Sequence, residues 1–69
     1  MKERIENSVH NLRTKRGLTQ EELAEKVGVT RQTIIAIERG NYTPSVMLAL
    51  KLSAIFKVSV EEIFKIYDK

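Results

Sequence analysis

The stretch VTRQTIIAIERG, residues 29–40, decides the fold of this chain. Its pattern predicts a helix, because Thr30 can serve as the N-cap and Gly40 as the stop. At about 100° per residue, Ile34 and Ile37 fall on one face, which is typical of a buried stripe. The opposite face carries Gln32, Ile35, Ala36 and Arg39, with Arg31 on its flank. A helix that only covers a core would place Glu and Lys there, so this face indicates contact with a partner.

A second helix precedes this stretch and is joined to it by a tight turn. Thr19 and Glu22 form a capping-box pattern, which predicts that this helix starts at residue 19. It should end at Gly28, which can adopt the positive φ that a chain reversal needs. Its inward residues are expected to be Leu23, Ala24 and Val27. Residues 20–39 therefore have the form of a helix-turn-helix unit.

Three further helices are predicted on either side of this unit. One covers residues 8–16 and ends at Gly17, and another begins after Pro44 and Ser45 and runs to about Phe56. The last begins at a second capping box in residues 59–62 and ends near residue 64. We therefore expect an all-α fold of five helices.

The tail, residues 63–67, resembles a short strand more than a helix, because Lys65 interrupts apolar and aromatic residues. Pairing of the tail with residues 4–6 would add a short two-stranded β element to the five helices. With 69 residues in all, the chain is expected to be one domain, 1–69. Within it, residues 45–69 are expected to form the dimerisation and tail region.

Composition excludes several classes of function. The chain has no cysteine and a single histidine, His10, so we expect neither a metal site nor a cofactor. No carboxylate pair lies in an evident pocket pattern, and we do not expect an enzyme. No apolar run is long enough to span a membrane and no signal-peptide pattern is present, which predicts a cytoplasmic protein. The net charge of +3 favours nucleic acid as a partner only if the charge is clustered.

Two segments carry a resemblance to a known family. The segments LRTKRGLTQEELAEKVGVTRQTIIAIERGNYTPS and LALKLSAIFKVSVEEIF closely resemble the phage-repressor and Cro-type helix-turn-helix family, also called the xenobiotic-response-element family. The resemblance covers roughly residues 8–64 and is strongest to the small single-domain regulators. It implies a five-helix, lambda-repressor-like DNA-binding domain that binds operator DNA as a homodimer and represses or activates transcription.

The resemblance also assigns DNA contacts. Residues expected to contact bases in the major groove are Arg31, Gln32, Thr33, Ile35 and Ala36. Residues expected to contact phosphates are Gln20, Thr30, Arg39, Asn41 and Tyr42. The side chains of Arg and Gln suit this role, because they can form paired hydrogen bonds with guanine and adenine respectively. One departure from the family is Lys57, which stands where a glycine often follows the fourth helix.

Two charged residues are expected to form a structural ion pair. Arg13 follows Val9 by four residues and Glu38 follows Ile34 by four, so each lies beside the inward stripe of its helix. The family resemblance places a salt bridge at the same two positions. We therefore expect Arg13 and Glu38 to pair and to hold the recognition helix against the first helix.

The fourth helix and the tail carry more apolar residues than one small core needs. Val46, Ala49, Leu50 and Phe56 are expected to serve the core. The residues expected at a dimer interface are Met47, Leu48, Ala54, Ile55, Ile63, Phe64, Ile66 and Tyr67. Apolar surface of this kind is typical of an interface, and it predicts a homodimer.

The sequence leaves two functions open. The first is a sequence-specific regulator, a repressor that binds a palindromic operator in double-stranded DNA as a homodimer. The alternative is an antitoxin or another protein-interaction module whose DNA binding is autoregulatory. No feature of the sequence indicates a membrane partner or a small-molecule effector.

Overall fold

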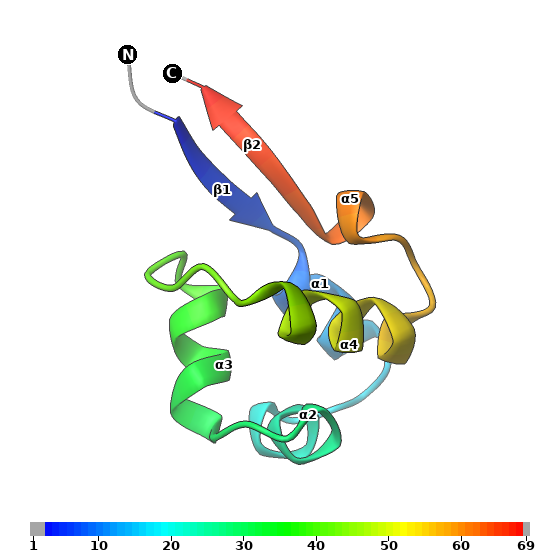
Figure 1. Cartoon of the computed structure of the whole chain (residues 1–69). Coiled ribbons are helices and arrows are strands. Elements are labelled where there is room, and N and C mark those ends of the chain that lie inside the picture. Colours follow the sequence, from blue (N-terminus) through cyan, green and yellow to red (C-terminus); the bar gives the residue numbers. More distant parts are fainter. Residues whose placement is uncertain (1–2, 69) are drawn as a thin grey trace.

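The computed structural model describes residues 3–68, which form five helices and two strands in one small unit (Figure 1). The helices are α1 (Val9–Lys15), α2 (Gln20–Val27), α3 (Arg31–Glu38), α4 (Val46–Phe56) and α5 (Val60–Ile63). The strands are β1 (Glu3–Asn7) and β2 (Phe64–Asp68). The five helices agree with the prediction, and so does the pairing of the two terminal segments. The class all-α is therefore correct only in part.

The helix ends follow the capping signals in the sequence. Thr19 and Ser59 each form a full capping box, at α2 and α5 respectively. Thr30 and Ser45 cap α3 and α4 by accepting a hydrogen bond from the backbone N–H three residues later. Lys57 adopts the left-handed conformation with φ 58° after α4, so a residue with a Cβ occupies a position that glycine favours.

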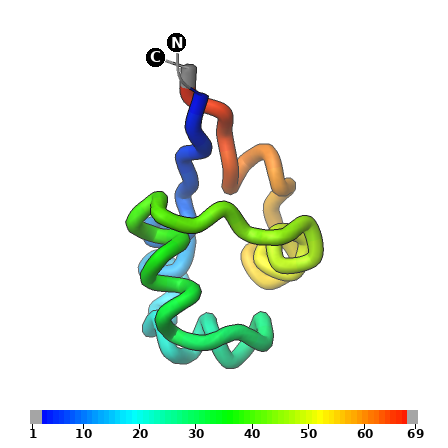
Figure 2. Tube along the Cα trace, turned by 60° about the vertical axis from the view of Figure 1, so that its left-hand side comes forward, coloured from blue at the N-terminus to red at the C-terminus, as the bar shows by residue number. Residues whose placement is uncertain are grey.

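The two strands form an antiparallel terminal hairpin, which here means β1 and β2 together. Ile5 lies opposite Ile66 in the register, and Asn7 lies opposite Phe64. The base of this hairpin is tied to the helices, because Ser8 N–H donates to the carbonyl of Ile63 (2.9 Å) and the Asn7 amide donates to that of Ile37 (2.8 Å). The rest of the hairpin projects from the helices and accounts for the elongated 36 × 23 × 21 Å shape (Figure 2).

The core lies between the five helices. Its fully or almost fully buried apolar residues are Val9, Leu23, Ala24, Val27, Ile34, Ile37, Leu48, Leu52, Phe56 and Ile63. Ile55 and Phe64 are partly buried against this core. The inward residues predicted for α2 and α3 are therefore confirmed.

Among the apolar residues of α4 and α5, Phe56 is buried as predicted, but several others were assigned to the wrong side. Leu48 is 6% exposed and Ile63 is 0% exposed, so neither is available for the dimer interface to which both were assigned. Conversely, Val46 (76% exposed) and Leu50 (57%) lie at the surface, although the sequence placed them in the core. The physical reason is that α4 is apolar on nearly every side, so the pattern alone does not select one face.

Among residues 3–68, no helix is long and apolar enough to cross a membrane. The same residues contain no cluster of three or more His, Cys, Asp or Glu side chains that could hold a metal ion.

Candidate nucleic-acid interface

The packing of α2 against α3 fixes the orientation of α3. Ala24 is buried where the two helices meet, and the Val29 N–H donates to its carbonyl (3.0 Å) across the turn. Gly28 makes the reversal with φ 77°. Ile34 and Ile37 of α3 are completely buried. Because the inward face of α3 is packed in the core, its opposite face points to the surface in a fixed orientation.

The outward face of α3 begins at its first turn. Arg31 and Gln32 are exposed there. Thr33 is half-buried, and its hydroxyl lies 3.2 Å from that of Thr30, which also caps the helix. Ile35 and Ala36 are half-buried one turn further on. All five predicted base-contact residues therefore lie on α3, and Arg31 and Gln32 are the most accessible.

A shallow hollow of about 370 Å³ joins α3 to the start of α2. Its lining residues are His10, Gln20, Arg31, Ile35, Glu38 and Arg39. The structure thus brings Gln20, predicted to contact phosphate, to the same surface as Arg31 and Ile35, predicted to contact bases. His10 was not predicted to take part in this surface.

Glu38 of α3, which lines this hollow, forms the expected ion pair with Arg13 of α1. Arg13 Nε donates to Glu38 Oε2 at 2.6 Å, and Arg13 Nη2 donates to Glu38 Oε1 at 3.2 Å. The two side chains are only 10% and 6% exposed. Arg13 Nη1 also donates to the carbonyl of Leu18 at 2.8 Å, in the connection between α1 and α2. One guanidinium therefore ties α1 to α3 and to the connection between α1 and α2.

Two further side chains complete the hydrogen bonds of Glu38. Gln20 Nε2 donates to Glu38 Oε1 at 3.1 Å, and His10 Nδ1 lies 3.4 Å from the same oxygen. Burial raises the pKa of Glu38, but the hydrogen bonds from Arg13, Gln20 and His10 and the charge of Arg13 outweigh it. The pKa of this carboxyl therefore lies below its ordinary value of 4.5.

The contact with Glu38 also orients the Gln20 amide. An amide nitrogen carries two hydrogens, and only one of them is needed for Glu38. The second hydrogen is not used by Glu38 and can donate to another acceptor. The sequence could not reveal the contact between Gln20 and Glu38, because it depends on how α2 and α3 meet.

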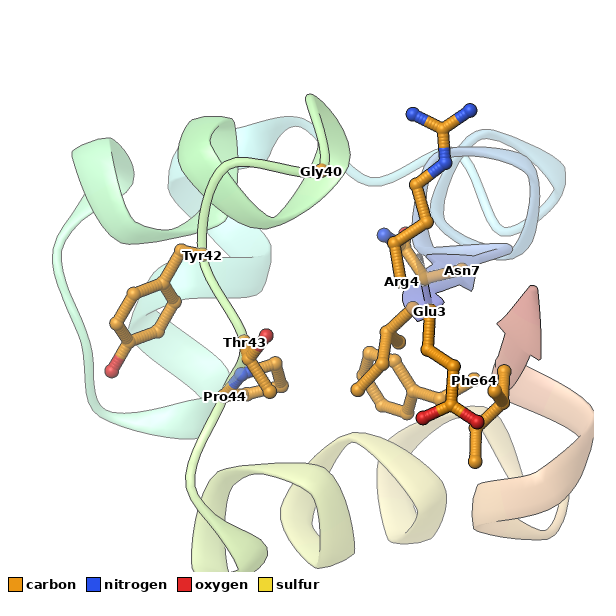
Figure 3. Close-up of a pocket in the computed structure, with 10 residues that line it drawn as sticks. Glu3, Arg4, Asn7, Gly40, Tyr42, Thr43, Pro44 and Phe64 are labelled. Atoms are coloured by element: carbon orange, nitrogen blue, oxygen red, sulfur yellow. The ribbon is translucent and has the colours of Figure 1, made fainter. Parts of the chain in front are cut away.

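The other predicted phosphate contacts lie at the end of α3 and in the loop that follows. Arg39 is exposed at the C-cap of α3. Asn41 is exposed, and its N–H donates to the carbonyl of Ala36 (2.9 Å), which holds the loop against the helix. Tyr42 is 47% exposed, and its phenol points away from Gly40 and the hairpin (Figure 3). Thr30, Arg39, Asn41 and Tyr42 thus lie at the two ends of α3.

Comparison with known proteins agrees with this geometry. A helix-turn-helix family model matches residues 9–63. The chain is 50% identical over 60 residues to an HTH-type transcriptional regulator of Bacillus subtilis, a match that covers 87% of this chain and 91% of that protein. It is 33% identical over 57 residues to the cryptic phage CTXphi transcriptional repressor of Vibrio cholerae. That second match covers 83% of this chain and 51% of the repressor.

A solved structure has a similar fold. The restriction-modification controller protein C.AhdI from Aeromonas hydrophila superimposes with a TM-score of 0.72 and 35% sequence identity. The superposition covers 78% of this chain and 82% of the controller protein.

Proposed function

The chain belongs to the helix-turn-helix family of DNA-binding transcriptional regulators, and we propose that it represses transcription by binding a palindromic operator as a homodimer. The observation that carries this proposal is the outward face of α3, where Arg31 and Gln32 are exposed on a helix whose other face is locked in the core.

In this proposal α3 enters the major groove with its first turn leading. Arg31 donates paired hydrogen bonds to a guanine, and Gln32 forms two hydrogen bonds with an adenine. Thr33, Ile35 and Ala36 contact neighbouring base edges. Each correct pair of hydrogen bonds discriminates against a wrong base by about 1–3 kcal/mol.

Phosphate contacts on either side of α3 fix its position in the groove. Gln20 and Thr30 lie at the starts of α2 and α3 and suit one side, and Arg39, Asn41 and Tyr42 suit the other. Such contacts add affinity for DNA of any sequence and set the register of the base contacts. They also make the affinity depend on salt, because each neutralised phosphate releases counterions.

The similarity to the CTXphi repressor favours repression over activation. Transcription in a purified system, from a promoter that contains the bound sequence, tests this point. Addition of the protein should lower the amount of transcript, whereas the double variant Arg31→Ala/Gln32→Ala should have no effect at equal concentration. A rise in transcript with the unchanged protein would show an activator, and an equal fall with both proteins would show that α3 is not involved.

A further inference from the structure

Large apolar side chains remain exposed on two neighbouring parts of the surface. On the terminal hairpin, Ile5 is 39% exposed and Ile66 is 72% exposed. On α4, Val46 (76%), Met47 (67%) and Leu50 (57%) form an exposed group that we call the α4 stripe. Contiguous apolar surface of this kind in a small protein marks a place where another molecule binds.

The hairpin and α4 are connected by hollows on either side of the loop after α3. A hollow of about 450 Å³ lies between the hairpin, where Ile5 and Ile66 line it, and the loop, where Tyr42 and Pro44 line it (Figure 3). A second hollow of about 200 Å³ is lined by Tyr42 and Met47. Tyr42 lines both hollows, so it lies between the apolar face of the hairpin and Met47 of the α4 stripe.

The hairpin lacks a cover of its own on this side. Ile5 and Ile66 are direct partners in the register, so their side chains leave the same face of the two-stranded sheet. The base of the hairpin is fixed to the helices by hydrogen bonds of Ser8, Asn7 and Lys65. An isolated pair of strands is marginal in water, and it gains stability when its apolar face packs against another element.

The charges next to the two apolar areas are opposite. Glu3 is exposed on the hairpin and lines the same hollow as Ile5 and Ile66. Lys51 follows Leu50, is exposed, and is the one charged residue within α4. Alternation along β1 places Glu3 on the same face as Ile5, whereas Arg4, which also lines this hollow, belongs to the opposite face. The Ile5–Ile66 face thus has an acidic edge, and the exposed face of α4 has a basic edge. Each copy of the chain carries both complementary surfaces.

We propose that a second copy of the chain covers this surface, with the Ile5–Ile66 face of each hairpin packed on the α4 stripe of the other copy. A two-fold axis then forms the same contact twice, as closed dimers do. Glu3 of each copy pairs with Lys51 of the other at the edge of the apolar contact. This inference rests on the homodimer of the proposed function and identifies the surface and the ionic contact that build it.

The position of this surface suits a DNA-bound dimer. The loop between α3 and α4 lines both hollows, so the proposed interface begins at the end of α3. A two-fold axis beside this loop can place two copies of α3 on one side of the dimer. Two recognition helices on one side can contact half-sites that lie about 34–36 Å apart, one turn of DNA.

Sedimentation of the full chain at micromolar concentration tests the surface. Leu50→Glu places a carboxylate in the apolar contact without touching the core, and it should weaken dimerisation by roughly a hundredfold or more. The matched control is Lys26→Glu on α2, an exposed position outside the proposed surface, which should leave dimerisation unchanged. A monomeric unchanged protein, or equal dimerisation of the unchanged protein and Leu50→Glu, would overturn the proposal.

Charge reversal tests the proposed contact between the hairpin of one copy and α4 of the other. Glu3→Lys and Lys51→Glu should each weaken the dimer, because each places like charges together. The double variant Glu3→Lys/Lys51→Glu should recover most of the lost affinity. A double variant that dimerises no better than the single variants would overturn the pairing of the hairpin with α4.

Binding to DNA separates this inference from the proposed function. Leu50→Glu keeps every predicted DNA contact, so at low salt it should still bind a short duplex that carries a single half-site, with the affinity of the unchanged protein. Loss of dimerisation with retained half-site binding supports the surface. If the unchanged protein binds the half-site but never dimerises, the result overturns this inference and leaves the DNA-binding proposal intact. Absence of half-site binding by the unchanged protein contradicts the DNA-binding proposal itself.

Discussion

Glu38 joins α1, α2 and α3 through Arg13, Gln20 and His10, and its removal should be costly. Glu38→Gln leaves the Arg13 guanidinium buried without a carboxylate, and we expect the free energy of unfolding to fall by about 3–5 kcal/mol. Urea denaturation at neutral pH measures this. The control is Glu25→Gln on exposed α2 surface, which should be nearly neutral. Equal stability of the two variants would contradict a buried ion pair.

The same carboxyl makes the stability depend on pH. Because the pKa of Glu38 is lower in the folded protein than its ordinary value of 4.5, its stabilising effect is fully present above that pH. The effect should be lost as the pH falls from about 4.5 through the lowered pKa of the folded state. Urea denaturation between pH 7 and pH 3 should therefore show a steeper acid loss for the unchanged protein than for Glu38→Gln. Parallel curves would show that Glu38 titrates alike in the folded and unfolded states.

Ile35 is an apolar residue that lines the hollow between α3 and the start of α2, together with Gln20 and Arg31. The apolar group that the major groove offers at a base edge is the methyl of thymine, and we predict that Ile35 contacts one. Replacing that thymine by deoxyuridine should weaken binding of the unchanged protein about fourfold per half-site, since a methyl group contributes about 0.8 kcal/mol. Ile35→Ala should be nearly indifferent to the replacement. Equal losses in both proteins, or none, would place Ile35 elsewhere.

At the scale of the residue, the sequence predicted an ion pair but not the wider set of polar contacts around Glu38. The pairing of Arg13 with Glu38 could be inferred, because each residue lies beside an inward stripe and the family has a salt bridge there. The contacts of Gln20 and His10 with Glu38 could not, since they depend on how three helices meet.

At the scale of the element, we expect different residues of α3 and its C-cap to contact bases and phosphates. If Arg39 contacts phosphate, Arg39→Ala should weaken binding to all DNA alike and lower the salt slope by about 1. If Gln32 reads a base, Gln32→Ala should instead remove preference at one base pair, worth about 1–3 kcal/mol. Titration of both variants against duplexes with single-base changes checks this. The assignment fails if Arg39→Ala changes base preference while Gln32→Ala weakens every site equally.

Helix ends were more predictable than helix faces. Capping at Thr19, Thr30 and Ser59 depends on local hydrogen bonds, so a short sequence window contains the necessary information. The inward face of α4 depends on which neighbours it meets, and apolar residues occur on nearly all of its sides. For that reason Leu48 was assigned to the surface and Leu50 to the core, the reverse of the structure.

At the scale of the whole molecule, the helix-turn-helix unit was predictable because caps, turn glycine and core stripe agree over twenty residues. The terminal hairpin was harder to predict, because its strands come from opposite ends of the chain and pair across the whole sequence. The proposed dimer accounts for the exposed apolar face of the hairpin. The proposed DNA contacts and the proposed dimer surface thus meet at Tyr42, in the loop after α3.

Selection of bound duplexes from a random DNA pool tests the central claim, that α3 reads a specific DNA sequence. The account predicts that the pool converges on a palindrome with half-sites about 10–10.5 base pairs apart, centre to centre. The double variant Arg31→Ala/Gln32→Ala should bind DNA weakly and enrich no such sequence. Failure of the unchanged protein to enrich any sequence, or enrichment of the same palindrome by the double variant, would contradict the account.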